Sequence, residues 1–113
     1  MVEEIVERSK LDELIRRSRI ALIAFTKPNS DAWNYAKRLL SKLESKAGYL
    51  MNIAIADASL ENISSREPVI RMYLDSKLVF EQQGVFWKHD LDYEALRRGI
   101  KSVLKKHSIK TLF

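Results

Sequence analysis

Hydrophobic and polar residues follow two rhythms along this chain, one typical of strands and one typical of helices. Continuous apolar runs of strand length occur at residues 20–25 and 49–56, as expected for strands that are covered on both faces. Between these runs, apolar residues recur at helical spacing and charged residues take the other side. The pattern predicts a strand, a helix and a second strand, with Ser30 or Asp31 as the helix N-cap and Gly48 at the helix end.

The N-terminal stretch predicts one more helix before the first of these strands. Ser9 is in the position of an N-cap, with Asp12 three residues later, and the helix is expected to run to about Ser18. Residues 2–8 are compatible with two structures. Their charged side chains favour a helix, whereas their apolar residues suit a short edge strand.

The second half of the chain predicts a hairpin. Residues 57–67 are polar and leave room for only a short helical turn. Pro68 then precedes an apolar run at residues 69–74, and a short turn leads to a partner strand at residues 78–82.

A last helix completes the pattern. It is expected to begin at Asp90 or Asp92, and its apolar stripe consists of Leu96, Ile100, Val103 and Leu104. The order is therefore (β)αβαββα. Strands joined by helices are parallel neighbours with right-handed crossovers, and the final hairpin is antiparallel. The sequence predicts an α/β protein with a mixed sheet of four or five strands and helices on both faces.

Composition agrees with one ordinary globular domain over residues 1–113. The chain is 46% hydrophobic and 31% charged, and it contains no repeat, linker or apolar run long enough for a membrane span. The first four residues are acidic rather than signal-like, so we expect a cytoplasmic protein without a membrane partner. Three glycines and two prolines indicate short loops, which are typical of thermophiles.

Cysteine and charge limit the chemistry. The chain has no cysteine, which excludes disulfides, thiol catalysis and thiolate metal sites. Its net charge is +5. The C-terminal stretch, residues 95–113, contains no acid and six basic residues: Arg97, Arg98, Lys101, Lys105, Lys106 and Lys110. This stretch is compatible with a solvated helix face or with a nucleic-acid surface.

Three stretches together resemble the thioredoxin family. "LDELIRRSRIALIAF" is similar to the helix and central strand that lead to a thioredoxin active site. "EPVIRMYLDSKLVFEQQG" resembles the segment with the family's cis-proline, hairpin and following glycine, and "LDYEALRRGIKSVL" resembles the closing helix. The ordered set covers residues 2 to 107, and it implies a thioredoxin-like fold.

The resemblance assigns family positions to individual residues. Ser30 takes the place of the attacking cysteine and Trp33 that of the resolving cysteine. Pro68 matches the cis-proline, so the resemblance predicts a cis Glu67–Pro68 bond, and Gly84 matches the glycine that lines the substrate groove.

The departures from the family argue against an enzyme. Ala24 replaces the buried acid that assists proton transfer in the family, and both cysteines are absent, so no disulfide oxidoreductase activity is expected. Ser30 has no recognisable base to activate it, and a helix cap is the better interpretation. His89, Asp90 and Asp92 lie within four residues, but no second ligand cluster completes a metal site. No metal and no cofactor are predicted.

Two functional hypotheses follow. In the first, a redox-inactive thioredoxin fold binds a protein or peptide of unknown identity, or a second copy of itself, through a groove of nine residues: Ser30, Asp31, Trp33, Glu67, Pro68, Gly84, Val85, Phe86 and Trp87. The opposing interpretation is that Trp33 and one residue of the Phe86–Trp87 pair pack in the core. In the second, the basic last helix binds nucleic acid, although the aromatic residues are not interleaved with the basic ones along the sequence.

Overall fold

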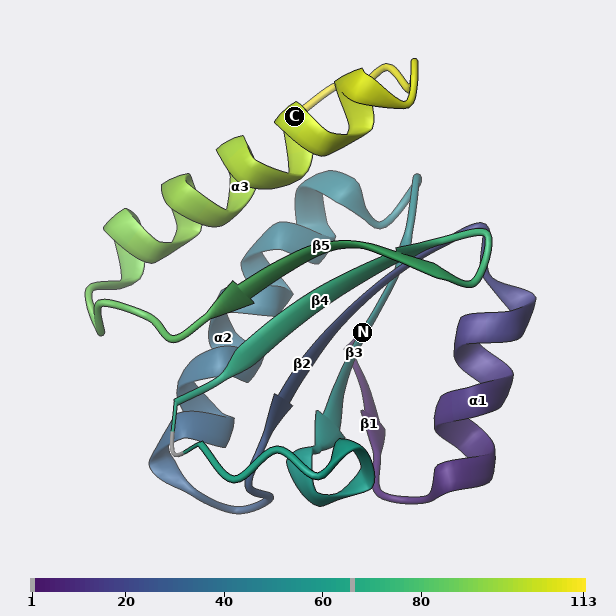
Figure 1. Cartoon of the computed structure of the whole chain (residues 1–113). Coiled ribbons are helices and arrows are strands. Elements are labelled where there is room, and N and C mark those ends of the chain that lie inside the picture. The colour runs from purple at the N-terminus through teal and green to yellow at the C-terminus, as the bar shows by residue number, and fades with distance from the viewer. Residues whose placement is uncertain (1, 66) are drawn as a thin grey trace.

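A five-stranded mixed sheet organises the chain, and the computed structural model describes residues 2–65 and 67–113 (Figure 1). The elements are, in order, β1 (Glu3–Ile5), α1 (Arg8–Arg17), β2 (Ile20–Thr26), α2 (Asp31–Ala47), β3 (Asn52–Asp57), the 3₁₀ turn η1 (Ala58–Glu61), β4 (Val69–Leu74), β5 (Lys77–Gln83) and α3 (His89–Lys106). The predicted order is confirmed, and the ambiguous N-terminal residues include a strand. No helix in the described part of the chain is long and apolar enough to cross a membrane.

The sheet has the strand order β1-β3-β2-β4-β5. β1, β3 and β2 run parallel, whereas β4 pairs antiparallel with β2 and β5 pairs antiparallel with β4. Every residue of β2 is buried, because this strand lies at the centre and has helices on both of its faces. That position explains its continuous apolar sequence.

Side chains of β2 alternate between two hydrophobic clusters, one on each face of the sheet. Leu22 and Ala24 belong to the larger cluster, to which α2 and α3 contribute their apolar stripes. Ile23 and Phe25 belong to the smaller cluster, which α1 covers. This two-residue period is the geometry of an extended strand, and it places α1 opposite α2 and α3 (Figure 1).

Among the predicted boundaries that differ from the structure, three involve a helix cap or a turn. Ser9 is not an N-cap, because α1 already begins at Arg8 and its cap residue, Glu7, makes no side-chain cap bond. β3 begins at Asn52 rather than Tyr49, since the turn after α2 continues through Met51, whose amide donates to the Ala47 carbonyl over 3.2 Å.

The last helix also begins earlier than predicted. α3 starts at His89, with Lys88 as its N-cap. Asp90 and Asp92 therefore both lie inside the first turn, and neither caps the helix. The structure gives the Asp92 carboxylate other hydrogen-bond partners, which matter for the binding surface.

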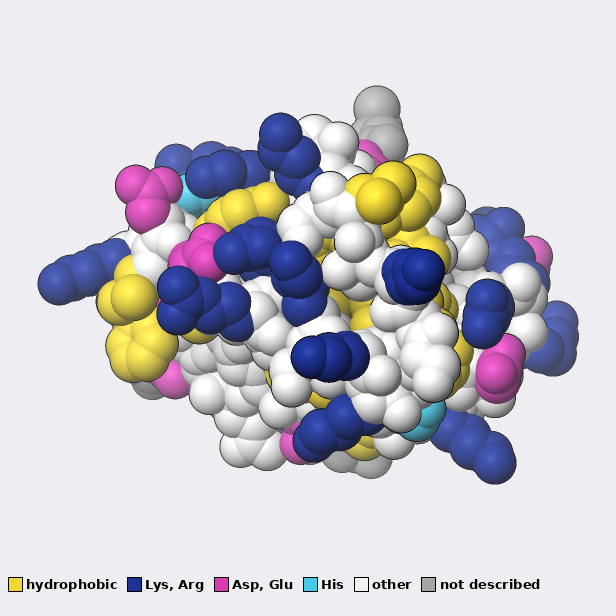
Figure 2. Space-filling view, turned by 90° about the horizontal axis from the view of Figure 1, so that it is seen from above, with side chains coloured by type: hydrophobic (Ala, Val, Ile, Leu, Met, Phe, Trp, Pro, Cys, Tyr) yellow, Lys and Arg dark blue, Asp and Glu magenta, His cyan; other side chains and the backbone are white. Residues whose placement is uncertain are grey.

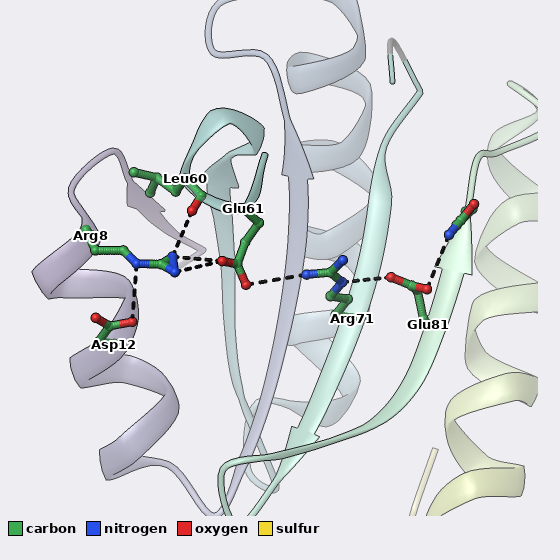
Figure 3. Close-up of polar contacts among 7 residues, drawn as sticks. Arg8, Asp12, Leu60, Glu61, Arg71 and Glu81 are labelled. Atoms are coloured by element: carbon green, nitrogen blue, oxygen red, sulfur yellow. Dashed lines mark hydrogen bonds and ion pairs between the residues drawn. The ribbon is translucent and has the colours of Figure 1, made fainter. Parts of the chain in front are cut away.

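A chain of ion pairs crosses the sheet face beside α1 (Figure 3). Glu61 of η1 receives two 2.8 Å bonds from Arg8 of α1 and lies 3.4 Å from Arg71 of β4. Arg71 donates in turn to Glu81 of β5 over 2.7 Å, and its guanidinium lies 5.4 Å from the Phe25 ring. Through Glu61, these contacts join η1 to α1 on one side and to β4 on the other. η1 is the short turn predicted within residues 57–67.

Candidate binding surface

The start of α2 is a capped helix terminus rather than a reactive site. The Ser30 hydroxyl accepts the Trp33 amide at 3.1 Å and donates to the Lys27 carbonyl at 2.6 Å. The prediction that Ser30 caps this helix is confirmed. Trp33 is only 4% exposed and belongs to the larger hydrophobic cluster. Its ring therefore packs in the core and offers no exposed surface for a partner. Asp31 follows the cap and is exposed.

The proline and glycine loops meet through their backbones. The Gly84 amide donates to the Pro68 carbonyl over 2.9 Å. Gly84 has a φ of +84°, a conformation that residues with a Cβ rarely adopt, and a Glu67 carboxylate oxygen lies only 2.3 Å from where a Cβ would be. The predicted proximity of Glu67, Pro68 and Gly84 is therefore real.

The predicted cis peptide bond is wrong. No cis bond occurs among the described residues, which include both Glu67 and Pro68. The bond is trans, the form that most X–Pro bonds adopt. In this conformation the Pro68 carbonyl still reaches Gly84, so the contact between the two loops does not require a cis bond.

The loop between β5 and α3 exposes large apolar side chains. Phe86 is 65% exposed, Trp87 is 46% exposed, and Leu91 in the first turn of α3 is exposed by half. Hydrophobic side chains also show at the left end of Figure 2, which looks onto α3 from above, on the side where that helix begins. The interpretation that one member of the Phe86–Trp87 pair packs in the core is therefore wrong.

A buried carboxylate fixes the backbone of this loop. Asp92 is fully buried, and it accepts the Phe86 amide at 2.7 Å and the Tyr35 hydroxyl in a short hydrogen bond. Burial, followed by the hydrogen bond to Asp92, raises the pKa of Tyr35 well above its ordinary value, so this hydroxyl stays protonated as a donor. The Phe86 backbone is thus held by α3 and α2 while its ring points into solvent.

Trp87 is held in a conformation that large residues rarely adopt. Its φ is +62°, in the left-handed region where a bulky side chain is strained. Its ring lies against Tyr35, with the two ring centroids 5.0 Å apart. Strain of this kind persists only where the surroundings enforce it, and here the neighbouring hydrogen bond to Asp92 and the contact with Tyr35 do so.

The predicted groove is assembled only in part. A cavity of 400 Å³ has walls formed by Glu67, Gln82, Gln83, Gly84, Val85, Phe86 and Ala95. This cavity unites the glycine loop with the proline loop. Ser30 and Trp33 do not line it, so the start of α2 contributes a cap and a core residue instead of a third wall.

The basic residues divide into two groups. Arg97 and Arg98 both donate to Glu94, with Arg98 at 3.0 Å, and these bonds lower the Glu94 pKa to about 2. In the described part of the chain the side chains of the remaining four residues form no hydrogen bond or ion pair: Lys101, Lys105, Lys106 and Lys110. Lys and Arg side chains cover much of the α3 face in Figure 2.

Aromatic and basic residues approach one another in space although they are separate in sequence. The Arg38 guanidinium lies 5.9 Å from the Tyr35 ring, which also contacts Trp87. Lys42 lies over Tyr93 at 4.4 Å. Tyr35 and Tyr93 are themselves buried, however, so these contacts do not create an exposed aromatic and basic surface on which bases could stack.

The three candidate metal ligands do not converge. The described residues contain no group of three His, Cys, Asp or Glu side chains placed to hold a metal ion. His89 lies 3.8 Å from Asp90, but the Asp92 carboxylate points into the protein toward Tyr35 and Phe86.

Three residues that form or support the exposed loop were not predicted from the sequence to do so. Leu91 lies outside the apolar stripe of α3, and that departure is a signal of exposure. Tyr35 and Asp92 are 57 positions apart, and no local pattern connects them.

Comparison with known proteins identifies the fold. No protein-family model matches the sequence, and no curated protein matches it. Among solved structures, a Plasmodium falciparum thioredoxin superposes with a TM-score of 0.71 at 16% identity, over 89% of this chain and 98% of that chain. A thioredoxin from Trypanosoma brucei brucei gives 0.71 at 13% identity, over 93% and 92% of the two chains. Mitochondrial thioredoxin 3 from Saccharomyces cerevisiae gives 0.68 at 18%, over 89% and 94%. The chain has a thioredoxin-like fold and contains no cysteine.

Proposed function

We propose that this thioredoxin-like chain without cysteine is a binding module that holds a protein or peptide through the Phe86–Trp87 loop. The observation that carries the proposal is the combination of two exposed aromatic rings with a loop backbone that a buried carboxylate fixes. Thiol–disulfide exchange needs a thiolate, and this chain has none to supply.

A partner that covers the Phe86–Trp87 loop would gain binding free energy from the two aromatic rings. Burying a large apolar side chain contributes about 1.5–3 kcal/mol, so two aromatic rings offer a strong anchor before the costs of association. A strained residue such as Trp87 costs of order 1–3 kcal/mol in the free protein. Because the loop is already held in place, a partner does not have to order it on binding.

The cavity beside the loop suggests what kind of partner fits. Its volume of 400 Å³ lies within the range of ligand pockets, and Phe86 forms one wall while Glu67 forms another. An apolar side chain can rest on the ring, and a basic side chain can pair with the exposed carboxylate. We therefore favour an extended peptide that carries an apolar residue near a Lys or Arg.

A displayed library of random peptides, selected on the immobilised protein, tests the proposal. We expect an enriched motif with an apolar residue near a basic one. Binding of the selected peptide should weaken at least about tenfold in Phe86→Ser and Trp87→Ser, since each change removes an anchor worth more than about 1.4 kcal/mol.

Leu112→Ser is the matched control, because Leu112 is 88% exposed and lies beyond the other end of α3. This variant should bind like the parent protein. If no motif is enriched, or if all three variants bind alike, the loop is not the binding surface. A homodimer that is lost in Trp87→Ser but not in Leu112→Ser would identify the partner as a second copy of the chain.

Nucleic acid is the alternative partner, and the four unpaired lysines of the C-terminal region favour it. Phosphate contacts without base contacts give weak binding that does not depend on sequence and falls steeply with salt. Titration with labelled DNA and RNA at several salt concentrations measures this. Salt-resistant or sequence-selective binding would favour the alternative over the peptide module.

A further inference from the structure

The C-terminal residues fold back beside the last turns of α3 and form with them a cavity that is open to solvent. Ser108 has a φ of +59°, and its amide donates to the Lys105 carbonyl at 3.0 Å, while the Ile109 amide donates to the Leu104 carbonyl at 2.9 Å. This pair of bonds ends the helix and reverses the chain direction. The Leu112 amide then donates to the Tyr49 hydroxyl at 2.8 Å, which fixes the segment against the turn that follows α2.

The cavity combines an apolar surface with positive charge. It has a volume of 580 Å³, and its lining consists of Lys101, Ser102, Lys105, Ser108, Ile109, Lys110, Thr111 and Leu112. This volume is typical of sites that hold small molecules. On the right of Figure 2, above the later turns of α3, hydrophobic side chains show between Lys and Arg side chains.

The charge of this cavity is not neutralised from within the described part of the chain. None of the described lining residues is acidic, and the three lysines form no ion pair. Arg97 and Arg98, earlier on the same helix, are both paired with Glu94. The lysines can therefore bind an external anion without first breaking an internal ion pair.

We propose that this cavity binds a small amphipathic anion, namely an apolar chain or ring that carries one phosphate or carboxylate group. The lysine ammonium groups supply the donors for the anionic group. Ile109 and Leu112 supply the apolar surface, so an inorganic anion uses only half of the site. This site is separate from the Phe86–Trp87 loop, which lies at the other end of α3, and it does not depend on the proposed peptide binding.

Titration by ¹⁵N NMR with decyl phosphate, kept below its micelle concentration, tests the site. We expect saturable shifts at the amides of residues 101–112. Inorganic phosphate should bind at least about tenfold more weakly, because it gains no apolar burial. Decyltrimethylammonium should not bind. Equal binding of the cationic and anionic amphiphiles would overturn the proposal, as would the absence of any saturable shift with decyl phosphate.

Two lysines that are neighbours in sequence provide the matched variants. Lys105 lines the cavity and Lys106 does not, yet both are exposed and both lie in the last turn of α3. Lys105→Glu should weaken decyl phosphate binding at least about tenfold, and Lys106→Glu by less than about threefold. Leu112→Ser, which removes part of the apolar wall, should also weaken it. Equal losses in the two charge variants would show general electrostatic attraction and contradict the cavity.

Vesicles containing phosphatidylglycerol separate a free amphiphile from a lipid headgroup in a bilayer. If the protein binds both the vesicles and the monomeric decyl phosphate, and Lys105→Glu weakens both, the cavity accepts lipid headgroups. If it binds the monomer alone, the ligand is a free amphiphile. Binding to vesicles without binding to the monomer would assign the lysines to a bilayer surface and overturn the proposal.

Discussion

Replacement of Asp92 by Ala tests the anchor of the exposed loop. The carboxylate accepts hydrogen bonds from the Tyr35 hydroxyl and the Phe86 amide, and it is fully buried. The substitution leaves two donors without a partner, at a cost of about 1–3 kcal/mol each. It also removes a buried charge whose desolvation is unfavourable, which offsets part of that cost. We expect a net loss of about 2–4 kcal/mol in the free energy of unfolding.

Asp90→Ala is the control for this substitution. Asp90 also lies in the first turn of α3, so it interacts with the helix dipole as Asp92 does. Its side chain, however, is exposed, and its distance of 3.8 Å from Lys42 makes a weak ion pair. Its replacement should cost less than about 1 kcal/mol. Urea denaturation measures both values, and the difference between the variants isolates the buried hydrogen bonds from the dipole.

Hydrogen exchange gives the local measurement. The Phe86 amide donates to Asp92, so its exchange should accelerate more than any loss of global stability explains. Asp92→Asn keeps the side-chain shape and one acceptor oxygen, and it replaces Asp92→Ala in this measurement if the Ala variant does not fold. Equal stability of the Asp92 and Asp90 variants, together with unchanged Phe86 exchange, would refute the claim that the carboxylate holds this loop.

Three further predictions concern chemistry, packing and pH. In an insulin-reduction assay with a dithiol donor, the protein should match the blank, and turnover above the blank would contradict the absence of redox chemistry. Trp33→Ala should lower stability by about 3–5 kcal/mol, because this ring is buried, whereas Trp87→Ala should cost less than about 1.5 kcal/mol; equal costs in urea denaturation would contradict the assignment of core and surface. The pKa of Glu94 is lowered to about 2, mainly by the hydrogen bond from Arg97, so its contribution to stability is present above pH 4.5 and is lost as the pH falls toward 2. The melting temperature of Glu94→Gln should therefore fall less than that of the parent protein as the pH is lowered over this range. If the melting temperatures of the two proteins fall in parallel, the lowered Glu94 pKa is contradicted.

Features set by local sequence were predictable. The β2 strand was visible as a continuous apolar run because it is covered on both faces. Ser30 was recognisable as a cap because its partner, the Trp33 amide, is only three residues away. In both cases the information lies within a few consecutive residues of the sequence.

Features set by distant contacts were not predictable. Asp92 has the position and chemistry of a helix-start residue, and only the approach of Tyr35 from α2 reveals it as a buried anchor. The ion pairs that join Glu61 to Arg8 and Arg71 likewise connect separate elements. The trans bond before Pro68 depends on how two loops meet, which a resemblance between segments does not determine. The bond from the Phe86 amide to Asp92, which holds the loop backbone, was hidden for the same reason.

The most direct test of the binding surface is backbone NMR mapping of a peptide selected on the immobilised protein. If the Phe86–Trp87 loop is the binding surface, the largest shifts and the new protection from exchange will occur at Glu67, Gly84, Phe86, Trp87 and Leu91, and the Trp87 indole proton will shift with the same affinity. Shifts centred on residues 101–112 or on α1, with the Phe86–Trp87 loop unchanged at saturation, would contradict it.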